Sequence, residues 1–236
     1  MTPKLKLTYS YGPAVFFIDF TEQWDPKSPW HDVRVRQALN YAIDRQAINE
    51  QQTLGASTPT ANIVPRAFEF YLPLEAYSYN PEKARQLLQE AGYPNGFDAG
   101  EISIGPPYYS IAEAVATYLQ AVDIRIKVRP MERAAFFAAW REKKLTGLAL
   151  GGTGAFGNAA VRLEPFAIGG GTYAKGSYPD MDELYKQQSV ERDRKQREAM
   201  LHRIQQLMHE RVMFAPCLSW AGPTALARVW RNPALG

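Results

Sequence analysis

The protein has 236 residues, of which 46% are hydrophobic and 22% are charged, and its formal net charge is +3. This length suits one domain or two small ones, and the composition excludes a largely disordered chain. The small net charge does not favour a nucleic-acid-binding protein, whose binding face usually concentrates basic residues. Cys217 is the only cysteine, which excludes a disulfide framework and a cysteine metal cluster, and we expect a small buried side chain there.

The N-terminal region predicts two strands. Apolar and polar side chains alternate over residues 5–9, and a second apolar run covers residues 15–20, after Gly12 and Pro13. The first residues lack the apolar core of a secretory signal, and no apolar run approaches the ~20 residues of a membrane span. Taken alone, these features predict a soluble cytoplasmic protein.

Residues 32–45, DVRVRQALNYAIDR, predict an amphipathic helix. The apolar residues that recur at helical spacing are Val35, Leu39, Ala42 and Ile43. Asp32 is placed to cap the first turn, and Asp44 to cap a second, kinked segment. We expect Arg34, Arg36 and Arg45 on the outer face of this helix.

Residues 53–73 predict an irregular surface segment, because prolines and threonines are frequent and apolar periodicity is weak. A short helix follows, with Asn80 as its cap, Pro81 in its first position and Gly92 at its end.

The second half of the chain alternates strands and helices, which is typical of an α/β domain. We expect strands at residues 101–105, 124–128 and 148–150, with helices between them. Ser110 and Glu113 predict a capping box for the first of these helices. A long helix over residues 191–211 and two strands, at 213–220 and 224–230, complete a single predicted α/β domain.

Glycines follow the predicted strand at residues 148–150. Gly152, Gly154 and Gly157 match the GxGxxG spacing of a dinucleotide-binding loop. That mechanism also needs a helix that begins directly after the loop and holds a pyrophosphate at its N-terminus. Residues 158–165 lack sufficient helical periodicity, so we expect a flexible or ligand-lining loop. A nucleotide-binding enzyme that uses Gly152 to Gly157 is the less favoured alternative.

No residue pattern predicts a catalytic centre, a metal site or a cofactor. His202 and His209 lie two helical turns apart, ~11 Å along the axis, which is too far for one metal ion. We expect both to be exposed and solvated.

Aromatic residues indicate where a ligand would bind. Tyr108 and Tyr109 lie between a strand and a helix, Phe156 lies in the glycine loop, and Trp220 ends a strand. Aromatic side chains at strand ends of an α/β fold often line the ligand crevice. The alternative for each is packing at the rim of the core.

Three stretches carry a family resemblance. They are DVRVRQALNYAIDR at residues 32–45, NPEKARQLLQEAGYPNGFD at 80–98 and ERDRKQREAMLHRIQQLM at 191–208. In this order they resemble the C-terminal portion of extracytoplasmic solute-binding proteins of ABC importers, in the peptide/nickel-binding family, family 5. Members of that family are considerably longer than this chain.

The resemblance implies an α/β fold of the type II periplasmic-binding-protein kind, a mixed sheet flanked by helices. Such proteins trap a ligand between two lobes and present it to a membrane permease. Residues 1–236 would form the second lobe, with the first lobe absent from this chain. The implied partners are a small-molecule or peptide ligand, the N-terminal lobe and an ABC permease, without nucleic acid. The implied location is periplasmic or extracytoplasmic.

One departure from the family concerns the ligand. Peptide-binding relatives carry an aspartate after the strand that corresponds to residues 148–150, where it pairs with the peptide's amino terminus. Here Ala155 stands about where that acid is expected, and Gly152 where a tryptophan is common. A ligand of different charge, or one held by Thr153, Asn158 and backbone amides, fits better. The predicted ligand-binding residues are Tyr108, Tyr109, Thr153, Phe156, Asn158 and Trp220. A stand-alone interaction domain, with its cleft face buried against another copy, is the second alternative.

Overall fold

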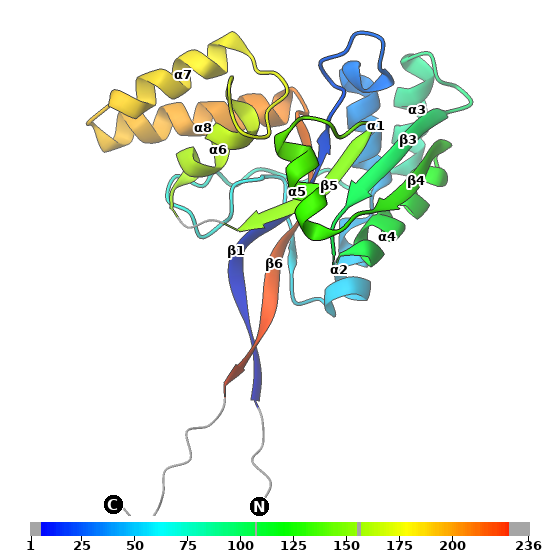
Figure 1. Ribbon diagram of the computed structural model, residues 1–236, viewed down its shortest axis with the longest axis horizontal. Helices are drawn as coiled ribbons and strands as arrows, with labels where there is room; N and C mark the ends of the chain where they lie inside the picture. The colour runs from blue at the N-terminus through cyan, green and yellow to red at the C-terminus, as the bar shows by residue number, and fades with distance from the viewer. Residues whose placement is uncertain (1–5, 107, 155–156, 227–236) are drawn as a thin grey trace, which may run out of the picture.

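Six strands form one mixed sheet in the order β2-β6-β1-β5-β3-β4 (Figure 1). The computed structural model describes residues 6–106, 108–154 and 157–226. The strands are β1 (Lys6–Phe20), β2 (Thr58–Pro59), β3 (Phe97–Ile104), β4 (Ile124–Pro130), β5 (Leu148–Gly154) and β6 (Phe214–Leu226). β3 pairs in parallel with β4 and β5, whereas β1 pairs antiparallel with β5 and β6. The predicted α/β class with a mixed sheet is confirmed.

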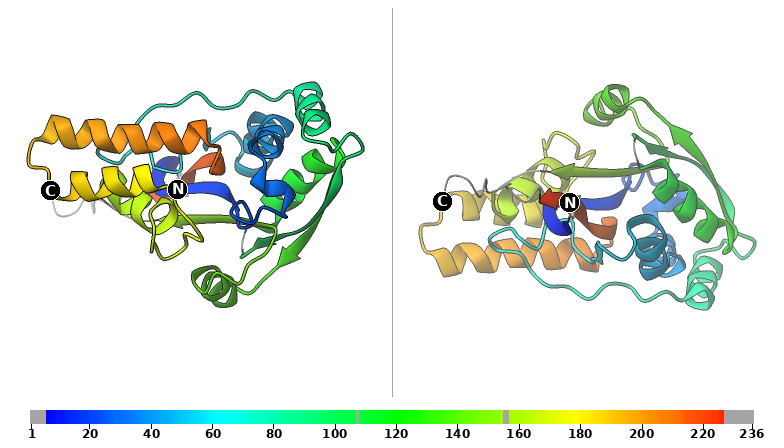
Figure 2. Two further views of the ribbon diagram at one scale, coloured as in Figure 1. Left: turned by 90° about the horizontal axis from the view of Figure 1, so that it is seen from above. Right: turned by 90° about the horizontal axis from the view of Figure 1, so that it is seen from below.

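Helices cover both faces of the sheet in two groups (Figure 2). The first group is α1 (Val33–Ala42), preceded by the short 3-10 helix η1 (Pro29–His31), α2 (Arg45–Thr53), α3 (Pro81–Glu90) and α4 (Tyr109–Gln120). The second group is α5 (Arg133–Arg141), α6 (Ala159–Ala167), α7 (Pro179–Val190) and α8 (Arg194–Glu210). Because side chains alternate along a strand, Ile18 and Phe20 of β1 enter the core under the first group, and Val15 and Phe17 the core under the second.

β1 and β6 are each one long strand, so the prediction of two strands at each end of the chain was wrong. The two strands pair from Lys6 opposite Leu226 to Asp19 opposite Phe214. A register shift between Tyr11 and Val15 accommodates Gly12 and Pro13, since a bulge tolerates a residue without an N–H. Residues 6–11 and 221–226 extend beyond the body as a two-stranded ribbon, here called the β1–β6 ribbon (Figure 1).

The helix caps follow most of the predictions. Asp32, Asp44 and Asn80 each accept a hydrogen bond from a backbone amide in the first turn of α1, α2 and α3. The predicted capping box of α4 was wrong, because that helix begins at Tyr109 and Ser110 already lies inside it. Tyr108 takes the cap position without a side-chain hydrogen bond.

Arg36 and Arg45 are buried, which corrects their predicted place on an outer face. Arg36 donates to the carbonyls of Trp30 at 2.6 Å and Val212 at 2.9 Å. Arg45 donates to the carbonyl of Pro216 at 2.7 Å and to residues around the α1–α2 junction. A guanidinium has five donors, so backbone carbonyls at element ends can satisfy it in place of water. These contacts connect α1 to Val212, just before β6, and α2 to Pro216 within β6.

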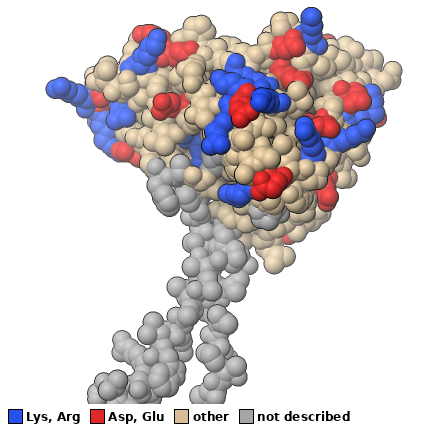
Figure 3. All heavy atoms as spheres, viewed as in Figure 1, with Lys and Arg blue, Asp and Glu red and all other residues tan. Residues whose placement is uncertain are grey.

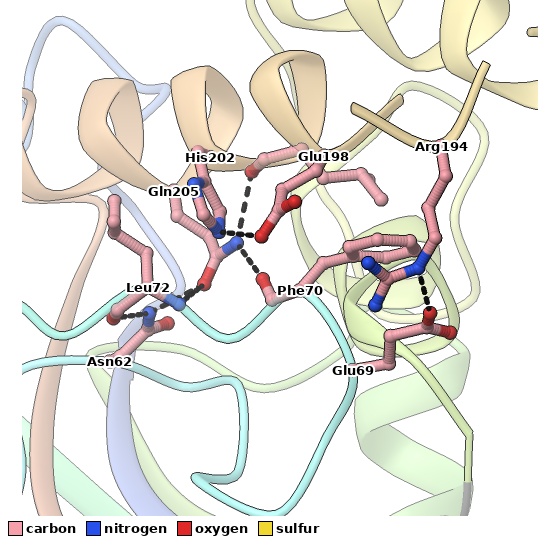
Figure 4. A network of polar contacts seen from close by, with 9 residues as sticks. Asn62, Glu69, Phe70, Leu72, Arg194, Glu198, His202 and Gln205 are labelled. Atoms are coloured by element: carbon pink, nitrogen blue, oxygen red, sulfur yellow. Dashed lines mark hydrogen bonds and ion pairs between the residues drawn. The ribbon is translucent and has the colours of Figure 1, made fainter. Parts of the chain in front are cut away.

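The middle of the segment 53–73 is buried, with residues 60–65 all in the interior, which corrects the prediction of a surface segment for that part. Ile63, Val64, Phe68 and Phe70 belong to the core under the second helix group. Gln205 of α8 organises this segment (Figure 4), because its Oε1 accepts from Asn62 Nδ2 at 2.7 Å and its Nε2 donates to the Phe70 carbonyl at 2.8 Å. These apolar residues follow no helical or strand period, which is why the pattern concealed their burial.

Candidate ligand-binding cleft

A cleft of about 110 Å³ opens at the carboxyl ends of the parallel strands β3 and β5. Its lining residues are Ala14, Phe16, Ile104, Gly105, Pro106, Tyr108, Arg133, Phe136, Phe137, Leu150, Gly151, Gly152 and Gly154. Ala14 of β1 pairs with Gly154 at the carboxyl end of β5. The cleft therefore lies at the end of the central strands from which the β1–β6 ribbon departs. In α/β sheets, ligands bind outside the carboxyl ends of strands, which makes this end the candidate site.

Three aromatic rings pack together beside the cleft and are here called the aromatic triad: Phe16 and Tyr108, which line the cleft, and Trp220, which contacts both. The ring centroids of Phe16 and Tyr108 are 4.3 Å apart, and that of Trp220 lies 5.3 Å from Phe16 and 5.6 Å from Tyr108. All three contacts are tilted or edge-on, the favourable arrangement for aromatic pairs. Phe16 is buried, whereas Tyr108 and Trp220 remain partly exposed.

The structure brings together only part of the predicted ligand-binding set. Tyr108 lines the cleft and Trp220 packs against it through the triad. Tyr109 instead donates its hydroxyl to the Met131 carbonyl at 3.1 Å, which ties the start of α4 to the end of β4. Asn158 caps α6, with Oδ1 accepting from the amide of Ala160 at 3.0 Å.

The two remaining predicted residues lie in the glycine-rich loop region. The backbone of Thr153 pairs with Val15 in the sheet, at the edge of the cleft. Phe156 lies outside the described residues. Their ligand contacts, like those of the other four, stay predictions.

Sequence reasoning missed Phe16 and Arg133. Phe16 lies in an apolar run of β1, where nothing in the pattern distinguishes it from core residues. Arg133 is the first residue of α5 and resembles any other basic residue on a helix surface.

The glycines of β5 serve close packing. A Cβ at Gly152 would lie 2.9 Å from Cε1 of Phe16, and one at Gly151 would collide with the ring of Trp140. Real Cβ atoms do not approach carbon so closely, so only glycine at these two positions allows the rings of Phe16 and Trp140 to pack against β5. Gly152, the first glycine of the dinucleotide-like spacing, therefore has a packing explanation.

α6 begins directly after the glycine loop, so the prediction that no helix follows it was wrong. Pro165 and the buried Arg162 interrupted the apolar pattern that would have revealed this helix. Its first amides already have acceptors: Ala159 donates to the Glu69 carbonyl at 2.9 Å, and Ala160 to Asn158. A pyrophosphate would need these same N–H groups, so the arrangement still does not favour a nucleotide site.

The two histidines of α8 are only partly exposed, which corrects the prediction that both are solvated. His209 packs against Tyr77 with ring centroids 5.5 Å apart, and burial lowers its pKa. His202 Nε2 lies 3.8 Å from a carboxylate oxygen of Glu198. Within the described ranges, no group of three or more His, Cys, Asp or Glu residues has the arrangement of a metal site.

Positive and negative charges are mixed on one face of the molecule. On the face shown in Figure 3, basic and acidic side chains are interspersed over the helices. This pattern lacks the concentrated basic face of a nucleic-acid-binding protein. In the part of the chain that the structure describes, every helix is too short or too polar to cross a membrane.

Residues 1–174 match the family model described as "Bacterial extracellular solute-binding proteins, family 5 Middle". The chain belongs to this family. The resemblance predicted from the three sequence stretches is thereby confirmed.

Curated relatives include proteins with different named ligands. Heme-binding protein A of Haemophilus influenzae is 30% identical over 226 residues, which are 91% of this chain and 41% of that protein. The dipeptide-binding protein of Escherichia coli K12 is 30% identical over 230 residues, 92% of this chain and 42% of that protein. The glutathione-binding protein GsiB of Salmonella choleraesuis is 44% identical over 105 residues, 44% of this chain and 20% of that protein. This family 5 chain thus spans less than half the length of these relatives.

Solved structures share the fold. HbpA2 from Haemophilus parasuis superposes with a TM-score of 0.84 at 25% identity, covering 96% of this chain and 46% of that chain. DppA from Helicobacter pylori, in complex with the peptide STSA, gives a TM-score of 0.83 at 21% identity, covering 94% and 44%. The periplasmic-binding-protein fold expected for this family 5 chain is confirmed.

Proposed function

We propose that residues 1–236 form a single α/β domain, the C-terminal lobe of a two-lobed solute-binding protein that serves an ABC importer. The position of the cleft carries this proposal. The cleft opens at the same end of the central strands from which the β1–β6 ribbon departs. A first lobe connected through that ribbon would lie over Tyr108 and Trp220 and close the cleft from the other side.

On this proposal, the chain contributes half of a binding site. The cleft has about 110 Å³, whereas ligand pockets are commonly ~300–1,000 Å³ and bury ~70–90% of their ligand. The partial exposure of Tyr108 and Trp220 is consistent with a surface that a second lobe completes. The chain therefore supplies one wall and needs the other to hold a solute tightly.

The relatives support the class of function. Their names specify heme, dipeptide and glutathione as ligands, and all are binding proteins rather than enzymes. We propose that this chain likewise acts without catalysis, on a peptide-like or other small solute. Its further partners would be the N-terminal lobe and the membrane permease, and it would work outside the cytoplasm.

Titration calorimetry tests the half-site directly. We expect the isolated chain to show no tight binding to peptides, sugars or metal complexes, because a one-sided cleft leaves most of a ligand in water. A submicromolar affinity for any of them would contradict the proposal.

The alternative of a stand-alone interaction domain rests on the same exposed rings. A second copy could cover Tyr108 and Trp220 in place of a first lobe. Light scattering over a range of concentrations separates the two: a monomer at all concentrations supports the half-site, and a concentration-dependent dimer supports the interaction domain.

A further inference from the structure

The cleft has an unusual charge distribution. Arg133 is the only charged side chain among the described residues that line it. The other lining side chains are apolar or aromatic, and four glycines present backbone. An acid that could receive a ligand's ammonium group is therefore lacking from the described lining.

The guanidinium of Arg133 stacks on an aromatic ring. Its Cζ lies 5.5 Å from the centroid of Phe137, one turn further along α5. The adjacent acid, Glu132, uses Oε2 to accept the amides of Ala134 at 2.7 Å and Ala135 at 3.2 Å. Glu132 is thereby held as the helix cap, and no ion pair to Arg133 is found in the described ranges.

Several other exposed or partly exposed arginines have carboxylate partners. Arg194 pairs with Glu69 at 3.0 Å (Figure 4), and Arg211 with Asp180 at 2.6 Å. Arg194 and Arg211 also lie over aromatic rings, Phe70 at 5.2 Å and Tyr178 at 4.2 Å. Arg133 differs because the described residues give it no carboxylate partner, which leaves its N–H groups for another acceptor. A planar guanidinium suits carboxylate and phosphate groups, which it can bind with two parallel hydrogen bonds.

Resting on the proposed function, we infer that the solute of this cleft carries an anionic group that pairs with Arg133 and an apolar body that packs on Phe16 and Tyr108. Both features follow from the lining, since Arg133 provides its charge and Phe16 and Tyr108 provide aromatic apolar surface. A free ammonium group at this place would meet a like charge, which disfavours it.

Three probes with one aromatic body and different charges test this inference: N-acetyl-phenylalanine, its neutral amide, and phenylalaninamide, which is cationic. Backbone amide chemical shifts of the isotope-labelled chain are followed during titration to millimolar probe concentrations. We expect shifts at Gly151 and Gly152, with the anionic probe binding about fivefold more tightly than the neutral one and the cationic probe weakest.

Variants then locate the charge. Arg133→Gln is expected to reduce the affinity of the anionic probe to that of the neutral amide. Arg141→Gln is the matched control, because Arg141 is exposed on the same helix and does not line the cleft. It should leave the ranking of the probes unchanged.

The possible failures are distinguishable. If all three probes shift the cleft amides with equal affinity, and Arg133→Gln changes nothing, the anionic ligand class is wrong while the cleft remains a binding surface. If no probe shifts Gly151 or Gly152, the cleft is not where the solute binds and the inference fails, whereas the proposed function is tested separately by calorimetry and light scattering.

Discussion

Trp140 donates its indole N–H to Oδ2 of Asp19 at 2.9 Å, beneath the strand that borders the cleft. Trp140 is also the ring that a Cβ at Gly151 would strike, so the same side chain contacts the buried acid and supports the floor of the cleft. Burial raises the pKa of Asp19 to about 6, against the opposing effects of the Trp140 hydrogen bond and of Lys175. The buried acid therefore links the stability of the cleft floor to pH.

The raised pKa of Asp19 predicts that the free energy of unfolding falls as pH rises from about 4 to about 6. The folded state binds the proton of Asp19 more strongly than the unfolded state, so unfolding becomes easier as the carboxyl ionises between its two pKa values. Asp19→Asn keeps an acceptor for Trp140 and removes the ionisation. We expect the variant to be more stable by about 2 kcal/mol at pH 7.5 and to lose this pH dependence. Urea unfolding at a series of pH values measures it; an unchanged pH profile would contradict the prediction.

Gly152→Ala tests the close approach of Phe16 to β5. The new Cβ would lie 2.9 Å from Phe16, so the ring must move and the triad loosens. We expect a loss of about 1–3 kcal/mol in the free energy of unfolding. Gly105→Ala is the control at another strand end, because its Cβ would meet Phe136 at an ordinary 3.6 Å. Equal losses for the two variants would argue against the packing role of Gly152.

Arg45→Met tests the buried guanidinium. The carbonyl of Pro216 and the side-chain oxygen of Asn40 would lose their donor while staying buried. We expect destabilisation by about 2–4 kcal/mol, since hydrogen bonds to a charged group contribute more than neutral ones and unmade ones are costly. Arg34→Gln, at the surface of the same region, should hardly change the denaturation midpoint. A neutral effect of Arg45→Met would show that these carbonyls find other partners.

Gln205→Leu tests the contact between α8 and the segment of residues 53–73. The substitution leaves the Asn62 amide, the Leu72 N–H and the Phe70 carbonyl without this partner (Figure 4). We expect a loss of about 2–3 kcal/mol and faster amide hydrogen exchange at Leu72 and its neighbours. Gln206→Leu, one position along on the exposed side of α8, is the control. Protection that is equal in both variants would contradict this role.

The local sequence was sufficient for the features that act within one helical turn or one strand. Asp32, Asp44 and Asn80 were identified as caps because a cap bonds to amides two or three residues away. The alternation of strands and helices indicated the α/β class for the same reason. The three family-like stretches were enough to identify the family, and Tyr108 and Trp220 were selected as aromatic residues at strand ends.

Only the tertiary structure decided which distant residues meet. Arg36 and Arg45 have the spacing of surface residues. Both are nevertheless buried, because they donate hydrogen bonds to backbone carbonyls in and next to β6. The cleft likewise depends on Phe16 of β1, Tyr108 before α4 and Trp220 of β6, three residues that become neighbours through sheet pairing. A periodic pattern reports which side of an element is apolar, but it carries no information about the partner that will cover that side. Long-range pairing supplies that partner, and so it determines both the buried arginines and the wall of the cleft.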